Sequence, residues 1–134
     1  MNKYLLDTNI CVYFIKGLFN LEKKIAKIGS ENLYISEITI AELKYGVENS
    51  THKEKNRITI EKFINSIQIV PIIGSLDIYA KEKANLKKKG KIIDDFDLLI
   101  GSSAIANNLI LVTRNIKHFQ RISNIEIENW VKSA

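Results

Sequence analysis

Five short apolar runs are spaced along the chain and separated by longer amphipathic stretches. Runs of this length that end in polar residues predict buried strands, whereas a helix needs a longer periodic pattern. The predicted strands are Tyr4–Leu6, Leu33–Ile35, Ile67–Ile73, Leu109–Thr113 and Ile125–Ile127. Pro71 has no backbone N–H to donate, so the run that contains it is expected at a sheet edge or at the end of a strand.

The stretches between these runs predict helices. Asp7-Thr8 is a capping signal for the first helix, and Gly29, Gly46 and Gly90 are stop signals for three others. The predicted helices cover residues 8–15, 21–28, 36–46, 53–66, 76–89, 95–108 and 115–119. Strands that alternate with helices predict an α/β fold, a single domain over residues 1–134 with a central parallel sheet flanked by helices on both faces.

Length and composition narrow the class of protein. The 134 residues suit one compact domain, and 46% hydrophobic with 26% charged residues is typical of a globular chain. Cys11 is the only cysteine, which excludes an internal disulfide and fits a reducing cytosol. The first residues lack an apolar signal segment, and no apolar run is long enough to span a membrane. We therefore expect a cytoplasmic protein.

The formal net charge of +5 is concentrated in one place. Residues 81–91 contain six lysines and one glutamate, and outside this segment the basic and acidic residues balance. A basic patch on a neutral body is what binding to a polyanion requires, because contact with phosphates releases counterions. The alternative is a solvated lysine face of a helix.

Polar residues directly after the predicted strands are the first candidates for chemistry, because ligands of open parallel sheets gather at the carboxyl ends of strands. Asp7 follows the first strand, where it either caps the next helix or faces a site. Glu42 lies on the apolar side of its helix, where a carboxylate is costly unless it is paired or bound to a metal. Thr39 and Glu42 also fit a capping box, which is the structural alternative for Glu42.

Three aspartates cluster at the start of the predicted helix 95–108. Acidic residues are common in a first turn because they complement the helix dipole. Asp97, however, shares a face with small or polar residues, which leaves room for a ligand or another backbone to approach. We therefore favour Asp97 as the site residue, and Asp95 or Asp94 is the second choice, depending on where the helix begins.

Asn115 follows the strand with the clearest pattern, and it either faces the site or caps the short helix after it. Other side chains with reactive groups show no such placement. Cys11, His52 and His118 have no partner spacing for nucleophilic catalysis or zinc binding. We expect these three residues to be structural or to lie on the surface.

The candidate residues gain weight as a set, because all of them belong to elements of one sheet fold and are able to converge. The set consists of Asp7, Glu42, Asp97 and Asn115. Carboxylates that gather repel one another unless a cation neutralises them, and all-oxygen ligands suit magnesium or manganese rather than zinc. Neither a phosphate-binding loop nor a dinucleotide-binding glycine fingerprint is present, so no nucleotide cofactor is expected.

Motifs in a fixed order span nearly the whole chain. They are Leu6-Asp7-Thr8-Asn9-Ile10, Ser36 to Leu43 with Gly46, Gly90 to Ile100, Leu111 to Asn115 with Phe119, and Glu128-Asn129-Trp130. Asp-Thr-Asn alone is a weak signal, but its combination with Ala-Glu-Leu, Asp-Leu-Leu-Ile and Val-Thr-x-Asn is specific. With this combination the chain resembles PIN-domain ribonucleases, in particular VapC-type toxins of bacterial toxin–antitoxin modules.

The resemblance implies a metal-dependent endoribonuclease with an acidic pocket for Mg²⁺ or Mn²⁺. Asp7 and Asp97 match the metal-holding aspartates of the family, and Glu42 matches its glutamate, acting on the metal directly or through water. Asn115 stands where many PIN domains have a fourth aspartate, so the pocket has one negative charge less and the number of metal ions stays open. Gly101 replaces the usual alanine, a change expected to be harmless.

The same resemblance implies how RNA would be bound and cut. A metal would polarise the scissile phosphate and lower the pKa of a bound water, which Glu42 would orient or deprotonate. Family toxins commonly cut structured RNA, often transfer RNA. Basic side chains around the pocket would hold the RNA backbone. These side chains are Lys87, Lys88, Lys89, Lys91 and Arg114.

Partners are also implied by the resemblance. A cognate VapB-type antitoxin would silence the ribonuclease, with a basic side chain paired to the carboxylates of the pocket. An antitoxin helix would dock on the apolar face around Ile10, Tyr13 and Phe14, unless these residues only pack the core. By family analogy we expect a homodimer.

Two other classes of function compete with this interpretation. A phosphatase of the haloacid dehalogenase type requires Asp-x-Asp after its first strand, and here Asp7-Thr8-Asn9 supplies asparagine instead. A non-catalytic PIN-like scaffold would bind RNA or protein without cutting. The intact acidic set argues against the scaffold, and a metal-dependent cleavage assay separates the two.

Overall fold

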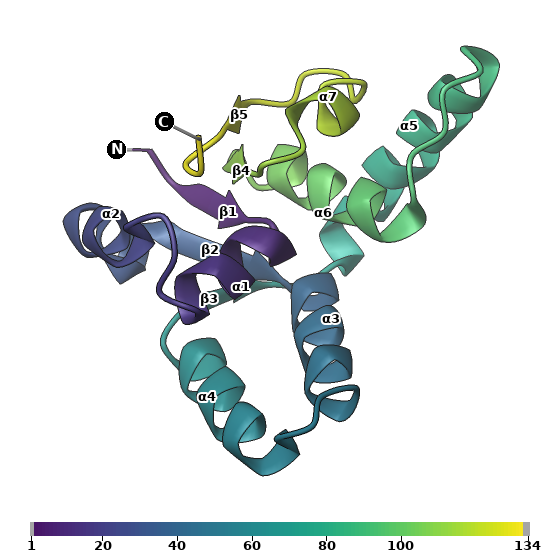
Figure 1. Ribbon diagram of the computed structural model, residues 1–134. Helices are drawn as coiled ribbons and strands as arrows, with labels where there is room; N and C mark the ends of the chain where they lie inside the picture. The colour runs from purple at the N-terminus through teal and green to yellow at the C-terminus, as the bar shows by residue number, and fades with distance from the viewer. Residues whose placement is uncertain (1, 133–134) are drawn as a thin grey trace.

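The computed structural model describes residues 2–132, and these form a parallel sheet between two layers of helices (Figure 1). The strands lie in the order β3-β2-β1-β4-β5, and every neighbouring pair is parallel. They are β1 (Tyr4–Leu6), β2 (Leu33–Ser36), β3 (Gln68–Val70), β4 (Ile110–Val112) and β5 (Ile127–Glu128). The predicted fold class is confirmed, and the carboxyl ends of all strands meet at one edge of the sheet.

Seven helices and two 3₁₀ turns connect these strands within the described residues. The helices are α1 (Thr8–Ile15), α2 (Leu21–Ile28), α3 (Glu37–Glu48), α4 (Lys53–Asn65), α5 (Leu76–Lys88), α6 (Asp95–Ala106) and α7 (Ile116–Phe119), and the turns are η1 (Ser30–Asn32) and η2 (Ile73–Ser75). Figure 1 shows α5, α6 and α7 on one side of the sheet, whereas α1, α2 and α4 lie on the other. Helix α5 extends away from the body of the molecule.

The sheet buries side chains on both faces because successive residues of a strand point in opposite directions. Leu5 packs into the core under α5 and α6, with Leu98 among its neighbours. Leu6, the next residue, packs into the opposite core with Ile10 of α1. All four side chains are at most 1% exposed. The short apolar runs of the sequence are therefore explained by burial on two faces.

Several element ends shift by one to three residues from the sequence-based expectation, and two of these shifts have a clear cause. Helix α3 passes through Gly46 and ends at Glu48, because Val47 is buried on the helix face and its packing outweighs the cost of about 1 kcal/mol for an interior glycine. The predicted strand Ile67–Ile73 shrinks to β3, which lies at the sheet edge and ends before Pro71. The prediction from proline is therefore confirmed, and the glycine stop at Gly46 is wrong.

The stop signal at Gly90 is confirmed and has a clear geometry. Gly90 has a φ of +69°, its N–H donates to the Lys87 carbonyl (3.1 Å), and the Lys91 N–H donates to the Leu86 carbonyl (2.9 Å). This pair of bonds is a Schellman motif, which requires a left-handed residue at the turn. It reverses the chain at the tip of α5 and directs Lys91 back toward the start of α6.

Candidate active site

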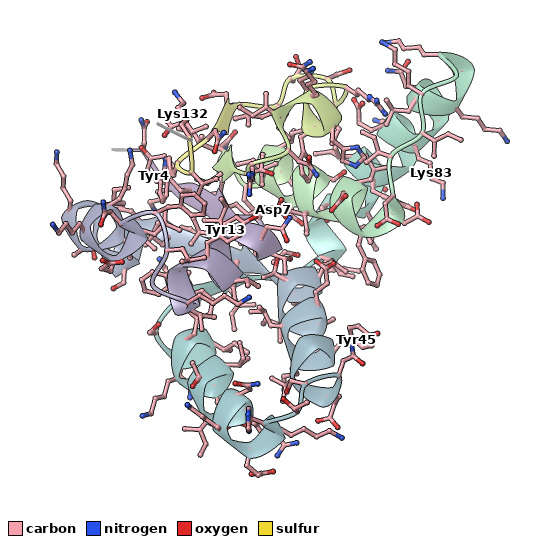
Figure 2. All side chains as sticks on the ribbon, viewed as in Figure 1. Tyr4, Asp7, Tyr13, Tyr45, Lys83 and Lys132 are labelled. Atoms are coloured by element: carbon pink, nitrogen blue, oxygen red, sulfur yellow. The ribbon has the colours of Figure 1, made fainter. Side chains whose placement is uncertain are left out.

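Asp7 directly follows β1, and its side chain is held from two directions. Oδ1 accepts a hydrogen bond from the Thr8 backbone N–H (2.8 Å), and Oδ2 accepts one from the Thr113 hydroxyl (2.8 Å). The residue is only 5% exposed, and Figure 2 shows it near the middle of the molecule, where β1 passes into α1. Asp7 caps α1 and also lies at the carboxyl edge of the sheet, so the two alternatives for Asp7 are compatible.

Glu42 lies in the middle of α3 and not at its start. Ser36 is the N-cap, with its Oγ accepting from the Ile38 N–H (3.0 Å), so the capping-box alternative for Glu42 is wrong. Oε1 of Glu42 instead accepts from the Thr8 hydroxyl (2.6 Å), which also lies 3.0 Å from the Thr39 hydroxyl. Thr8 therefore joins Glu42 on α3 to the first turn after Asp7.

Asp97 and His118 form a pair that the sequence did not indicate. Nε2 of His118 on α7 lies 3.1 Å from Oδ2 of Asp97 on α6, and both side chains are partly exposed. His118 thus contacts a candidate site residue, a contact that its position in the sequence did not indicate. Cys11 is buried, and burial raises the pKa of its thiol, which keeps it unreactive. His52 is exposed at the start of α4.

The other two aspartates of the cluster have different partners. Asp94 is the N-cap of α6 and accepts from the Phe96 N–H (3.1 Å). Asp95 accepts from Lys83 Nζ (2.8 Å) and from the Tyr79 hydroxyl (2.8 Å), and these bonds hold its pKa below the usual range. Asp95 is thus fixed toward α5, and the structure does not bring it together with Asp7.

Asn115 is the N-cap residue of α7, and its carbonyl accepts from the His118 and Phe119 N–H groups, but its side chain makes no capping hydrogen bond. Its backbone N–H donates to the Thr113 hydroxyl (3.0 Å), the same hydroxyl that donates to Asp7. Asn115 is exposed directly beside this link. Thr8 and Thr113 are the supporting residues that the sequence reasoning missed, although both lie inside the motifs that carried the resemblance.

The acidic residues affect one another through their charges. Burial is the main cause that raises the pKa of Asp7, and the charge of Asp97 raises it further, while hydrogen bonds from Thr113 and Thr8 oppose the rise. Burial also raises the pKa of Asp97, with the charges of Asp94 and Glu42 adding to it and His118 opposing. The carboxylates from β1, α3 and α6 therefore share one negative field.

The donor set fits a hard divalent cation. In the described part of the chain, no three aspartate, glutamate, histidine or cysteine side chains enclose a metal-sized space. Oε2 of Glu42 and Oδ1 of Asp97 nevertheless accept no hydrogen bond from the described residues, so each keeps a free oxygen. Carboxylate oxygens are the ligands that Mg²⁺ and Mn²⁺ prefer.

The apolar face proposed for an antitoxin is only partly a surface. Ile10 is 0% exposed and belongs to the core, so its place on a docking face is wrong. Tyr13 and Phe14 are half-buried and pack on Phe19 and Phe63 with ring centroids 5.1 and 5.8 Å apart. An apolar cleft of about 460 Å³ lies between α1, α3 and α4, with Glu42 in its lining.

The basic residues around these acids are not equivalent. Arg114 donates from Nη1 to the Tyr13 hydroxyl (2.9 Å) and lies one residue after Thr113. Lys83 is occupied by Asp95, and Figure 2 shows it on the projecting α5, apart from Asp7. Lys87, Lys88 and Lys89 are exposed at the tip of the same helix.

Comparison with known proteins identifies the family. The model of the PIN domain matches residues 4–125. The chain belongs to the PIN-domain family. This PIN domain is 43% identical over 134 residues to "Ribonuclease VapC2" of Rickettsia felis, a match that covers 96% of this chain and 98% of that protein. It is 33% identical over 131 residues to "tRNA(fMet)-specific endonuclease VapC" of Salmonella typhimurium, covering 97% and 99%.

Solved structures agree with this assignment. DNA-bound VapBC from Salmonella typhimurium contains a chain that matches the PIN domain with a TM-score of 0.88 and 32% identity, over 97% of this chain and 99% of that one. The resemblance to VapC-type ribonucleases drawn from the motifs is confirmed, and the haloacid dehalogenase alternative is wrong. PIN-domain nucleases generally depend on a divalent metal ion. Among the described residues, no helix is both long and apolar enough to cross a membrane.

Proposed function

We propose that this PIN domain, residues 1–134, is a cytoplasmic endoribonuclease toxin of a type II toxin–antitoxin module that cleaves structured RNA, with tRNA as one candidate. The observation that carries the proposal is the shared negative field of Asp7, Glu42 and Asp97 at the carboxyl edge of the sheet. Such a field favours a bound cation and is unfavourable without one. The names of the VapC relatives supply the substrate class.

Each residue of the site has a specific part in this proposal. Asp7 and Asp97 hold Mg²⁺ or Mn²⁺, and Glu42 contacts the ion directly or through water. When bound, the ion supplies polarisation of the scissile phosphate and a water of lowered pKa. Oε1 of Glu42 is occupied by Thr8, so Oε2 is the oxygen that orients the attacking water and accepts its proton. Asn115 adds an uncharged oxygen or N–H donor at the same edge.

The basic residues bind the RNA backbone in the same proposal. Lys91 precedes α6, which carries Asp97, and Arg114 follows β4, while the other lysines lie at the tip of α5, which extends away from the body of the molecule (Figure 1). These exposed cations, Lys87, Lys88, Lys89, Lys91 and Arg114, contact phosphates without reading the sequence. The choice of RNA then depends on its shape, as is common for structured RNA.

A VapB-type antitoxin is the proposed partner, and a homodimer the proposed state of the PIN domain. The cleft between α1, α3 and α4 is apolar along Val12, Leu43 and Val47 and reaches Glu42 at the site. An amphipathic antitoxin helix fits such a groove, and a basic side chain at its end would pair with the carboxylates. Co-expression with the product of the adjacent small reading frame tests this: failure to co-purify or to inhibit would contradict the antitoxin proposal alone.

Cleavage of RNA by the purified protein tests the proposed activity. Total cellular RNA is incubated with Mg²⁺ or with EDTA, and new ends are mapped. We expect new ends with Mg²⁺ only, and their loss in Glu42→Gln, which keeps the shape and the bond from Thr8 but removes the proton acceptor. RNA that is bound but left intact under all conditions would favour the non-catalytic scaffold. Full activity in Glu42→Gln would contradict the role of Glu42.

A further inference from the structure

A second concentration of positive charge lies on and around α7, the helix that also carries His118. An open cleft of about 610 Å³ is lined by four side chains that come from α7, the turn after it, and the connection between α5 and α6. They are Lys91, Lys117, Gln120 and Arg121, and we call this set the basic cleft. Its lining contains three cations, one amide and no acid.

Among the described residues, the cations of the basic cleft have no acidic partners. In residues 2–132 the ion pairs involve other residues, and none of the three cations lies within 4.0 Å of a carboxylate. All three are exposed. Like charges that share a cleft without counterions repel one another, so the arrangement is unfavourable unless an anion enters. This distinguishes the basic cleft from Lys83, which Asp95 neutralises.

The backbone fixes the basic cleft in place. The Schellman motif at Gly90 turns Lys91 back from the tip of α5, as described above. Arg121 donates from Nη1 to the carbonyl of Ile92 (3.2 Å), which ties the turn after α7 to the same connection. A guanidinium has five N–H donors, so most of those on Arg121 stay available for an oxygen-rich anion. The long side chains thus begin from fixed points.

The position of the basic cleft relates it to the acidic site. Lys117 precedes His118, whose ring lies 3.1 Å from Asp97. Figure 1 shows α7 over α6, on the same side of the molecule as α5. An RNA strand whose scissile phosphate lies at the acids would pass close to the basic cleft with a neighbouring part of its backbone.

We propose that the basic cleft binds a backbone phosphate of the RNA substrate, outside the acidic site and on the α7 side of it. Arg recognises phosphate oxygens in bidentate geometry, and Lys adds a point charge. The Gln120 amide adds an uncharged N–H donor. This phosphate subsite rests on the proposed function for its substrate. It goes beyond that function because it fixes the side from which the strand leaves the acids.

The experiment measures RNA binding without cleavage. A fluorescein-labelled single-stranded RNA of mixed sequence is titrated in EDTA at several KCl concentrations, and anisotropy gives the salt slope of the binding constant. The test variant is Lys117→Gln with Arg121→Gln. The control is Lys23→Gln with Lys27→Gln, which makes the same change of net charge on exposed lysines of α2. Thermal melting confirms that each variant is folded.

We expect the slope of the test variant to fall by about 0.7, because the loss of one phosphate contact on a single strand removes about 0.7. Lys117→Gln alone should remove about half of this, and Lys117 makes no bond on which the fold depends. The control variant should keep the wild-type slope. An unchanged slope in the test variant, or an equal loss in the control, overturns the proposal.

Poly-L-glutamate is the second probe, because an acidic protein segment also fits three cations. Loss of affinity for this polymer with an unchanged RNA slope would assign the basic cleft to a protein partner and overturn the RNA subsite. Wild-type cleavage with Mg²⁺, measured in parallel, separates the two proposals. A slope loss without any cleavage supports the basic cleft and contradicts the nuclease. Cleavage with an unchanged salt slope supports the nuclease and contradicts the basic cleft as an RNA subsite.

Discussion

Thr113→Val tests the link that holds Asp7 in place. The Thr113 hydroxyl is fully buried, donates to Oδ2 of Asp7 (2.8 Å) and accepts from the Asn115 N–H (3.0 Å). Valine has nearly the same shape, so the change removes two hydrogen bonds without opening a cavity. A bond to a charged group contributes about 1.5–3 kcal/mol and a neutral one about 1 kcal/mol. The methyl group that valine buries in place of the hydroxyl stabilises the folded chain by about 0.8 kcal/mol.

The expected net loss is therefore about 2–3 kcal/mol in the free energy of unfolding at pH 7. Urea unfolding in EDTA measures it, followed through Trp130, the only tryptophan, whose ring packs on Tyr4 of β1 at 5.1 Å. Thr59→Val on the exposed face of α4 is the matched control, because its hydroxyl donates only to the Lys55 carbonyl (3.1 Å). This control should change stability by less than about 0.5 kcal/mol.

The loss in Thr113→Val should also depend on pH. The hydroxyl favours the ionised form of Asp7, so its removal raises the pKa of Asp7 further above the usual range. For an acid whose pKa is higher in the folded chain, stability falls as the pH rises from the unfolded pKa through the folded pKa. The stability of Thr113→Val should thus fall further than that of wild type as the pH rises. The difference in unfolding free energy between the two should narrow toward pH 4. A gap under about 0.5 kcal/mol at pH 7, or one that does not narrow, would refute the reasoning.

Two further predictions concern the acids and the lysines. Asp7→Asn should abolish cleavage while the chain stays folded, because the change removes one charge from the acidic set but keeps the shape of the side chain; full cleavage by this variant would contradict the role of Asp7. Changing lysines 87–89 to glutamine should weaken RNA binding and reduce the salt slope by roughly one unit per lost phosphate contact, as measured by anisotropy, and an unchanged slope would exclude the tip of α5.

Most of the fold follows from local patterns in the sequence. The strand β4 and its neighbours were predictable because a short apolar run between polar residues fits few structures other than a buried strand. The end of α3 was not, because packing of Val47 decides it and no local signal reports that contact. Gly101 shows the same limit: a Cβ there would lie 2.6 Å from Cδ1 of Ile122, a residue 21 positions away in the sequence. The expectation that glycine is harmless at this position did not consider that Ile122 packs against it.

The site was predictable as far as its residues follow strand ends. Asp7 and Asn115 were found in this way, and Asp97 by the small residues on its helix face. The sequence did not show which partners distinguish Asp95 from Asp97. The structure shows them, since Lys83 and Tyr79, which bond to Asp95, lie on another helix. The pairing of His118 with Asp97 depends on how α7 packs on α6, and a lone histidine has no spacing that reveals it.

Asp97, and not its neighbour Asp95, is the aspartate that we place in the nuclease site. Mapping RNA ends in Mg²⁺ for Asp97→Asn and Asp95→Asn tests it most directly, because the two changes remove the same charge from the same helix turn. We expect Asp97→Asn to abolish cleavage and Asp95→Asn, whose partners are Lys83 and Tyr79, to cleave at the same positions as wild type. Full cleavage by Asp97→Asn, or an equal loss in both variants, would contradict the account.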